Sequence, residues 1–266
     1  MKYKCLSIAG FDGSGGAGIQ ADLKTFSALG CYGMTVLTAI AAQNTCGVKS
    51  CYDIPLQCIQ DQLETIFDDI RPDAIKIGML YSAPIITLIA DFLAQHAKNI
   101  PIVLDPVMLA KSGDALLKPD AIDALKTKLM PLCTVITPNL PEAEALVGKH
   151  ESTLALAKAL LNLQSSAALL KGGHAKGNTA DDFLLMQTGE THTLSATRIQ
   201  SKNTHGTGCT LSAAICSYLA KGESLLSACD KAKTYLHGAM LASAKHSVGQ
   251  GHGPVHHFYE WWPTTE

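Results

Sequence analysis

The stretch that decides the fold is near the start of the chain. It consists of Tyr3-Lys-Cys-Leu-Ser-Ile-Ala9, then Gly10-Phe-Asp-Gly-Ser-Gly-Gly-Ala-Gly18, then a segment from Ile19 to Leu29. The first segment is short and apolar, as in a buried strand, whereas in the third apolar residues recur every three or four positions, as in a helix. A strand, a glycine-rich turn and a helix in this order form the first half of a β-α-β unit.

The same rhythm recurs along most of the chain. Further strands are predicted at Thr35 to Ala42, Asp73 to Ile77, Ile102 to Leu104, Thr134 to Ile136 and Ala168 to Leu170. Helices are predicted at Pro55 to Asp68, Ala83 to His96, Pro119 to Leu129, Pro141 to Val147 and Ser152 to Leu161. Strands that alternate with helices favour an α/β fold with a mostly parallel central sheet.

The rhythm changes after Leu170. Phe183 to Met186 and Thr191 to Ile199, separated by a polar turn, predict an antiparallel hairpin at the sheet edge. Two helices, Thr210 to Ala220 and Ser224 to Ala242, are expected to close the chain. Because no linker or composition shift interrupts it, we expect residues 1–266 to form a single domain.

Composition excludes several classes of protein. The chain has 266 residues, 47% hydrophobic, with a net charge of −2 and no run of Lys or Arg, so we expect no nucleic-acid partner. Neither a signal peptide nor an apolar stretch of membrane-spanning length is evident, so no membrane partner is expected. Nine cysteines are an odd number without metal-ligand spacing, which favours reduced thiols in the cytoplasm.

The run Asn203-Thr-His-Gly-Thr-Gly-Cys-Thr210 leads directly into a predicted helix. Glycines and the free amides of a helix N-terminus form a site for an anion such as phosphate. We expect this environment to lower the pKa of Cys209, so that its thiolate accepts a proton beside the anion. The alternative is a glycine-rich helix start in which the cysteine packs as a small apolar residue.

The first glycine run also matches G-x-G-x-x-G, which is typical of dinucleotide-binding dehydrogenases. That fingerprint requires an acidic residue about 20 positions further on, where this chain has Gln43 and Asn44. The glycines instead allow a flat substrate to lie against the backbone, with Asp22, Gln43 and Met79 at its edges. A tight turn with solvent-facing polar ends is the structural alternative.

Polar residues also follow the later strands. Asn139 and Glu142 have the spacing of a helix capping box, but their oxygens, with Asp105, also suit Mg²⁺ held largely through water. Lys171 leaves a strand into two glycines and can contact phosphate, although lone loop lysines are usually solvated. Neither a Walker A motif nor the protein-kinase motifs are present.

Taken in order, these blocks resemble the hydroxymethylpyrimidine and phosphomethylpyrimidine kinases of thiamin biosynthesis. The similar blocks are residues 9–24, 38–44, 76–79, 104–108, 111–114, 137–143, 171–174, 203–213 and 249–258. The resemblance implies a ribokinase-like three-layer α/β/α sandwich and a homodimer. One departure is Gly10-Phe-Asp-Gly-Ser-Gly-Gly16, where the family typically has Gly-Ser-Asp-Ser-Ser-Gly-Gly.

The resemblance also implies the roles of individual residues. ATP would phosphorylate 4-amino-5-hydroxymethyl-2-methylpyrimidine and then its monophosphate, with Mg²⁺ as the metal. The implied residues are Cys209, Gly206, Thr207 and Gly208 for catalysis; Gly10, Asp22, Gln43, Met79 and Lys233 for the substrate; Lys171, Asn139 and Glu142 for ATP; and Asp105 and Glu142 for the metal. A vitamin B6 kinase on the same fold and a non-catalytic pyrimidine-binding regulator remain as alternatives.

Overall fold

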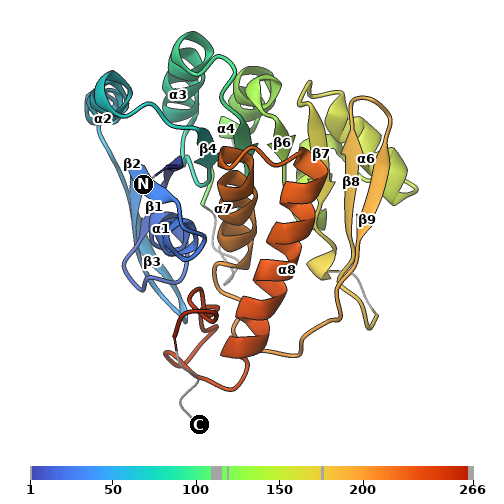
Figure 1. The fold of residues 1–266 in the computed structure, drawn as a ribbon. Coiled ribbons are helices and arrows are strands. Elements are labelled where there is room, and N and C mark those ends of the chain that lie inside the picture. The colour runs from blue at the N-terminus through green and yellow to red at the C-terminus, as the bar shows by residue number, and fades with distance from the viewer. Residues whose placement is uncertain (1, 109–115, 119, 175–176, 263–266) are drawn as a thin grey trace.

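A computed structural model describes residues 2–108, 116–118, 120–174 and 177–262, so the block at 111–114 lies outside the described residues. Its strands form one nine-stranded sheet in the order β3-β2-β1-β4-β5-β6-β7-β8-β9 (Figure 1). They are β1 (Lys4–Asp12), β2 (Tyr32–Asn44), β3 (Gly47–Asp53), β4 (Ala74–Ile77), β5 (Ile102–Leu104), β6 (Val135–Ile136), β7 (Ala167–Leu170), β8 (Asp182–Met186) and β9 (Thr191–Leu194). From β2 to β7 neighbours are parallel, whereas β3, β8 and β9 run antiparallel to their neighbours.

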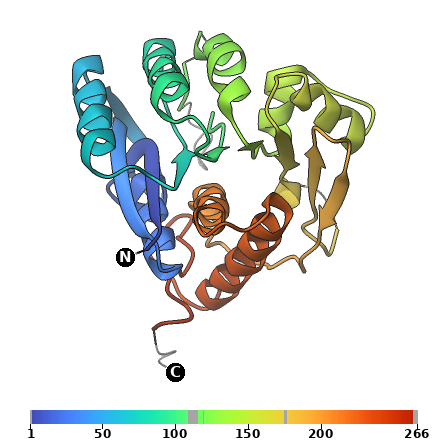
Figure 2. The ribbon, with the colours of Figure 1, turned by 45° about the horizontal axis from the view of Figure 1, so that its top comes forward.

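Helices cover both faces of this sheet (Figures 1 and 2). One layer contains α1 (Gly18–Ala28), α7 (Thr207–Ala220) and α8 (Leu225–Ser243). The other contains α2 (Leu56–Asp69), α3 (Ala83–His96), α4 (Ala121–Ala124), α5 (Leu140–Val147) and α6 (Thr153–Leu161). The predicted three-layer α/β/α sandwich with an antiparallel edge hairpin is therefore confirmed.

The two helix layers bury alternate residues of the central strands, because successive strand side chains point to opposite faces. In β4, Ile75 and Ile77 pack beneath α2 and α3, whereas Ala74 packs on the side of α1 and α7. All four residues of β4 are buried. Lys76 is the one charged residue of this strand, and it faces the layer of α1 and α7, where its partner Asp22 lies on α1.

Three details differ from the sequence predictions. Strand β3 was not predicted, because its half-exposed edge position tolerates the polar residues of Gly47–Asp53. The helix expected from Pro119 to Leu129 is only α4, followed by a π-helical turn at Leu125–Leu129. The second hairpin strand, expected as far as Ile199, ends at Leu194.

Residues 249–257 tie separate parts of the molecule together. The His252 amide donates to the Thr45 carbonyl oxygen after β2, and the His205 amide donates to the Gly253 carbonyl oxygen before α7. The Tyr235 hydroxyl of α8 donates to the His257 carbonyl oxygen. This segment, called the C-terminal strap below, therefore fixes the loop that precedes α7. None of the helices in the described parts of the chain combines the length and the apolar character that crossing a membrane requires.

Candidate active site

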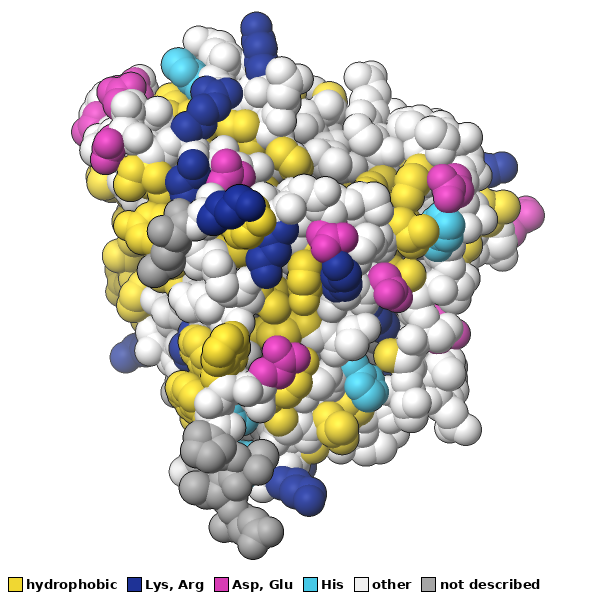
Figure 3. Space-filling model, viewed as in Figure 1, with side chains coloured by type: hydrophobic (Ala, Val, Ile, Leu, Met, Phe, Trp, Pro, Cys, Tyr) yellow, Lys and Arg dark blue, Asp and Glu magenta, His cyan; other side chains and the backbone are white. Residues whose placement is uncertain are grey.

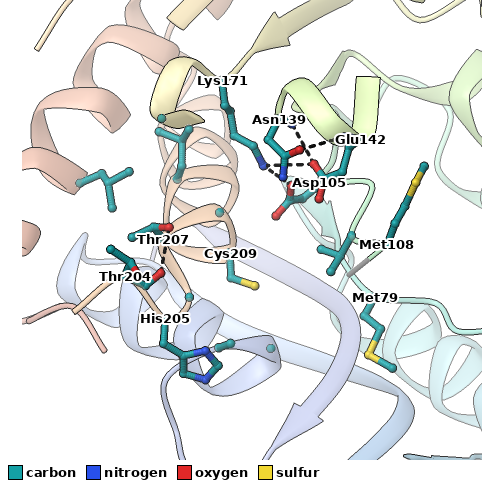
Figure 4. Close-up of a pocket in the computed structure, with 18 of the residues that line it drawn as sticks. Met79, Asp105, Met108, Asn139, Glu142, Lys171, Thr204, His205, Thr207 and Cys209 are labelled. Carbon is teal, nitrogen blue, oxygen red and sulfur yellow. Dashed lines mark hydrogen bonds and ion pairs between the residues drawn. The ribbon is translucent and has the colours of Figure 1, made fainter. Parts of the chain in front are cut away.

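A cavity of about 730 Å³ opens at the carboxyl ends of the parallel strands, where ligands bind in doubly wound sheets. Its lining includes residues that follow β1, β4, β5, β6 and β7, together with the start of α7 and part of α8. Figure 4 shows Cys209, Lys171, Asp105 and Met79 around it. The sheet therefore brings residues that are far apart in the sequence to one site.

The start of α7 forms a cradle that requires glycine. Gly206 has a φ of 76°, and a Cβ atom there would lie 1.8 Å from the Gly16 carbonyl oxygen. A Cβ atom on Gly208 would lie 3.0 Å from Asp105 Oδ2. No described side chain caps this helix. The Thr207 amide donates weakly to the Thr204 carbonyl oxygen at 3.5 Å, and the amides that follow it, with the positive end of the helix dipole, favour an anion. Gly206, Thr207 and Gly208 line the cavity, and their role as an anion site stays a prediction.

Cys209 lies in the first turn of α7, and its side chain lines the cavity (Figure 4). The expected lowering of its pKa is wrong. Burial raises the pKa of the Cys209 thiol to about 11, and the nearby Lys76 ammonium only partly opposes this. The sequence showed the glycines and the helix start but gave no measure of how deeply the sulfur is desolvated.

Lys171 joins two carboxylates on the cavity wall. Its Nζ lies 2.6 Å from Asp105 Oδ1 and 3.8 Å from Glu142 Oε2 (Figure 4). Burial lowers the pKa of Lys171, but the charges of Asp105 and Glu142 outweigh burial and raise it overall. Lys171 thus stays a cation beside the α7 cradle, within 3.3 Å of where a Gly208 Cβ would be.

Asn139 and Glu142 form the predicted capping box at the start of α5. The Asn139 amide donates to Glu142 Oε2 at 2.8 Å, and the Glu142 amide donates to Asn139 Oδ1 at 2.9 Å. Both residues also line the cavity, so the structural and the functional interpretations hold together. Burial raises the pKa of Glu142 to about 7, despite the opposing charge of Lys171.

The donor set fits a magnesium ion held mainly through water. Within the described ranges, no three His, Cys, Asp or Glu side chains come together as a metal cage. Lys171 already occupies one oxygen each of Asp105 and Glu142, which leaves Asp105 Oδ2 and Glu142 Oε1 for water molecules of a hydrated ion. Mg²⁺ usually keeps several waters and takes its remaining ligands from substrate phosphates.

Gly10, Gln43 and Met79 lie together at the β1-β2-β4 end of the cavity. A Cβ atom on Gly10 would lie 2.9 Å from Met79 Sδ, so glycine leaves a flat slot there. Asp22 does not line the cavity as predicted: it is fully buried behind the slot, where its Oδ2 lies 2.8 Å from Lys76 Nζ. Phe11, which with Gly13 departs from the family pattern, also lines this end.

Lys233 lines the cavity at its other end. It therefore lies apart from Gly10, Gln43 and Met79, the other cavity residues that were assigned to the substrate. Its Nζ lies 2.8 Å from Asp182 Oδ2 of β8 and also binds the Ala180 carbonyl oxygen. Strand β8 is separated from β1 by five strand spacings, or about 24 Å along the sheet. Lys233 therefore belongs to the β8-α8 end, not to the slot.

The sequence prediction missed Asp12 and His205, which join the two glycine loops. Asp12 Oδ2 accepts from the Gly16 and Ala17 amides and lies 2.8 Å from His205 Nε2. Burial opposes ionisation of Asp12, but His205, Ser14 and these amides outweigh it and hold the pKa of Asp12 well below its usual range. Asp12 could have been found in the sequence as an acidic residue at the end of a strand that is otherwise mostly apolar.

Lys76 and Arg198 were also missed. Lys76 interrupts an apolar strand, and a buried cation of this kind requires a partner. Arg198 lines the cavity and donates to the carbonyl oxygens of Gly172, Gly173, Gly177 and Thr179, so it holds the loop after Lys171. No motif marked this arginine in the sequence.

Comparison with known proteins agrees with this geometry. The family model for phosphomethylpyrimidine kinase matches residues 12–256. The chain belongs to the phosphomethylpyrimidine kinase family. A hydroxymethylpyrimidine/phosphomethylpyrimidine kinase of Rhizobium meliloti is 51% identical over 268 residues, which cover 98% of this chain and 99% of the relative. The corresponding Salmonella typhimurium kinase is 49% identical over 98% of this chain and 100% of its own length.

The chain is also similar to solved structures of two kinases. A phosphomethylpyrimidine kinase from Clostridium difficile is 44% identical, with a TM-score of 0.77 over 88% of this chain and 98% of the other. An ADP complex of Bacillus subtilis pyridoxal kinase is 38% identical, with a TM-score of 0.87 over 97% and 98% of the two chains. The ribokinase-like fold expected from the resemblance is thereby confirmed.

Proposed function

We propose that the protein transfers the terminal phosphoryl group of ATP to 4-amino-5-hydroxymethyl-2-methylpyrimidine and then to its monophosphate, as a kinase of thiamin biosynthesis. The observation that carries this proposal is one cavity in which the Cys209 sulfur, the α7 amide cradle and the Asp105–Lys171 pair meet. A nucleophile-activating group beside an anion site is what phosphoryl transfer to an alcohol requires.

In the first step, the Cys209 thiolate takes the proton of the hydroxymethyl group. The hydroxymethyl oxygen attacks the terminal phosphorus of ATP, and ADP leaves. The transferred group carries charge on its equatorial oxygens. The amides of Gly206 to Cys209 and the helix dipole stabilise that charge without moving. Gln43 hydrogen-bonds to the edge of the pyrimidine ring, and Gly10 and Met79 form the slot that holds this ring.

In the second step, the attacking oxygen belongs to a phosphate and is already ionised at neutral pH. A proton acceptor is therefore of little use there, and Cys209 contributes less. The same cradle and Lys171 serve both steps, because the charge on the transferred group is alike in each.

We place ATP between Lys171 and the β8-α8 end, with its phosphates toward the α7 cradle. Lys171 contacts the phosphates, and Arg198 and Lys233 support this half of the cavity. Asp105, Asn139 and Glu142 would hold the waters of a magnesium ion, which would neutralise phosphate charge when bound.

Phosphorylation of a B6 vitamer is a second candidate that a specific observation favours. The Bacillus subtilis pyridoxal kinase aligns with a TM-score of 0.87, against 0.77 for the Clostridium difficile phosphomethylpyrimidine kinase. Sequence identity points the other way, at 38% against 44%. We propose the pyrimidine as the preferred acceptor, because the relatives at 51% and 49% identity, which match over their full length, are named hydroxymethylpyrimidine/phosphomethylpyrimidine kinases.

A coupled assay of ADP release tests the proposal. It uses Mg²⁺-ATP with hydroxymethylpyrimidine, its monophosphate, pyridoxal, pyridoxine and pyridoxamine as acceptors. We expect turnover of both pyrimidines, with kcat/KM above that for every B6 vitamer. Faster turnover of pyridoxal would reassign the enzyme, and tight pyrimidine binding without ADP release would identify a non-catalytic regulator.

We further propose that residues 1–266 act as one domain, in a cytoplasmic homodimer without nucleic-acid or membrane partners. The single sheet supports the first point, and nine free cysteines support a reducing compartment. On the face drawn in Figure 3, Lys and Arg side chains are interspersed with Asp and Glu, which disfavours a nucleic-acid surface. The family resemblance supports the dimer, which light scattering on the purified protein tests.

A further inference from the structure

Lys76 has no task in the mechanism given above. It is fully buried in β4, yet its side chain reaches the cavity. A Cβ atom on Gly78 would come within 2.7 Å of Lys76 Nζ. The lysine side chain therefore extends along its strand toward the carboxyl end, where ligands bind.

Stability does not explain this lysine. Lys76 Nζ and Asp22 Oδ2 are 2.8 Å apart, and both side chains are completely shielded from solvent. The Ser7 hydroxyl donates to the same Asp22 oxygen at 2.5 Å. Desolvating two charges costs several kcal/mol per ion, and apolar replacements of buried ion pairs are often as stable or more so.

The pair also has unused hydrogen-bonding capacity. A lysine ammonium has three N–H donors, but in the part of the chain that the structure describes Asp22 is the one acceptor bonded to Lys76. Asp22 Oδ1 is buried and has no hydrogen-bond partner there. The ammonium can thus interact with a further negative group on the cavity side.

Cys209 is the nearby group that acquires negative charge. Helix α7, which carries it, packs against β4, and both side chains line the same cavity. Burial raises the pKa of Cys209, and the Lys76 ammonium is the strongest influence in the opposite direction, whereas Asp22 and Asp105 add to the effect of burial. Among the described residues, Lys76 is therefore the cation that most favours the thiolate.

We infer that Lys76 is a positioning residue whose ammonium, oriented by Asp22, stabilises the Cys209 thiolate that receives the alcohol proton. This inference rests on the proposed function. In the step it assists, the substrate O–H bond breaks and an S–H bond forms. The alcohol oxygen bonds to phosphorus as the bond from phosphorus to the ADP oxygen breaks, and the thiol later returns its proton to water.

Alkylation of Cys209 tests the inference without turnover. Iodoacetamide is added to the folded protein at pH 8, and modification is followed by mass spectrometry of the peptide that contains Cys209. We expect Lys76→Met to slow alkylation about tenfold, which corresponds to about one unit of thiol pKa. Asp22→Asn keeps an oxygen acceptor that orients Lys76 but removes the negative charge that raises the pKa of Cys209, so it should react at least as fast as the wild type.

The alkylation rates of the two variants are expected to change in opposite directions, and this separates an electrostatic role of Lys76 from a structural one. A loosened pocket would change both variants in the same direction. Equal slowing in both, or an unchanged rate in Lys76→Met, overturns the inference. If Lys76→Met does not fold, the double variant Asp22→Asn/Lys76→Met leaves no unpaired buried charge, and it should react about tenfold more slowly than Asp22→Asn alone.

Kinetics provide a second readout. Lys76→Met should lower kcat for hydroxymethylpyrimidine by at least tenfold more than kcat for the monophosphate, whose oxygen needs no proton acceptor. Equal loss in the two steps contradicts the inference. Absence of ADP release in the wild type would instead contradict the proposed function, and the alkylation result would still stand as a measurement on Cys209.

Discussion

At the scale of single residues, the site depends on groups whose protonation is shifted by burial. Cys209 and Glu142 both lose solvation when the chain folds, and both consequently hold their protons more tightly than they do in water. A thiol with a pKa of about 11 is a strong base in the small fraction of molecules where it is ionised. The chemistry of the first step should therefore respond steeply to pH.

Cys209→Ala should preserve the fold but slow phosphorylation of hydroxymethylpyrimidine by about 10²–10⁴-fold, the usual range for a lost general base. The monophosphate reaction should lose far less. In the wild type, kcat for the alcohol should rise between pH 7 and pH 9, since the thiolate fraction grows as pH approaches the thiol pKa. Steady-state rates on both acceptors measure this, and a pH slope that survives in Cys209→Ala removes the thiol from its role.

Glu142→Gln should make the nucleotide-free protein less sensitive to pH. The folded pKa of Glu142, about 7, exceeds its unfolded value of about 4.3. The native state therefore binds more protons between these values, and wild-type stability falls as pH rises through this window. Glutamine keeps the capping box but cannot ionise, so the variant should be the more stable protein at pH 8.

Urea unfolding from pH 4 to pH 8 measures the effect of Glu142→Gln. The difference in unfolding free energy should grow with pH, up to about 3 kcal/mol. Glu151→Gln, at an exposed position, is the matched control and should follow the wild-type profile. A Glu142→Gln protein that is less stable at every pH would show that the carboxylate is needed for the fold itself.

At the scale of elements, two glycine loops converge on the start of α7. The loop after β1 and the loop before α7 meet where Gly206 lies against Gly16, and the Asp12–His205 pair fastens them together. The anion cradle is therefore a product of both loops, because each fixes the backbone of the other.

Gly206→Ala should destroy this contact. An alanine Cβ would lie 1.8 Å from the Gly16 carbonyl oxygen, at a φ of 76° that only glycine adopts readily. We expect kcat/KM to fall more than about 100-fold, as when oxyanion donors are lost. Gly222→Ala has a similar φ of 85° but open space around the new methyl group, so it should cost about 1–2 kcal/mol of strain and leave activity intact.

Asp12→Asn should destabilise the protein at pH 7 by about 2–4 kcal/mol, because the buried aspartate accepts charge-assisted hydrogen bonds from both loops. The folded pKa of Asp12 lies below the unfolded value. Its contribution is therefore complete above about pH 4 and is lost as the solution is acidified through the folded pKa. Thermal unfolding should show the two proteins converging in acid, with exposed Asp91→Asn unchanged throughout.

Most elements could be predicted from the sequence, since buried parallel strands and amphipathic helices have distinct periodicities. The edge strand β3 could not, because one exposed face leaves little pattern in Gly47–Asp53. The glycine cradle was predictable from its spacing. The burial of Asp22 and the raised pKa of Cys209 depend on what packs around them, and the residue types alone do not reveal it.

At the scale of the whole molecule, the cavity spans the sheet from the slot near β2 to the β8-α8 end. In the function proposed above, acceptor and nucleotide therefore bind at opposite ends and meet at the α7 cradle. Substitutions at one end should affect one substrate and spare the other, because about 24 Å of sheet separates the ends.

Lys233→Gln removes the ion pair with Asp182 that supports the nucleotide half of the cavity. It should raise KM for ATP by about tenfold, a loss of the size of one charged hydrogen bond, and leave KM for the pyrimidine nearly unchanged. Gln43→Ala should do the reverse. Initial rates with each substrate varied in turn measure both constants. An increase in KM for the pyrimidine in Lys233→Gln would return this lysine to the acceptor end.

The C-terminal strap has a consequence for biosynthesis. Residues 249–257 leave the ribosome after every strand of the sheet, yet the loop that carries His205 and Gly206 depends on them for its position. The loop before α7 therefore cannot be fixed until residues 249–257, which follow all nine described strands in chain order, have been made. We expect a variant without residues 249–257 to lose activity even where its sheet forms, because the backbone that holds His205 in place is then missing.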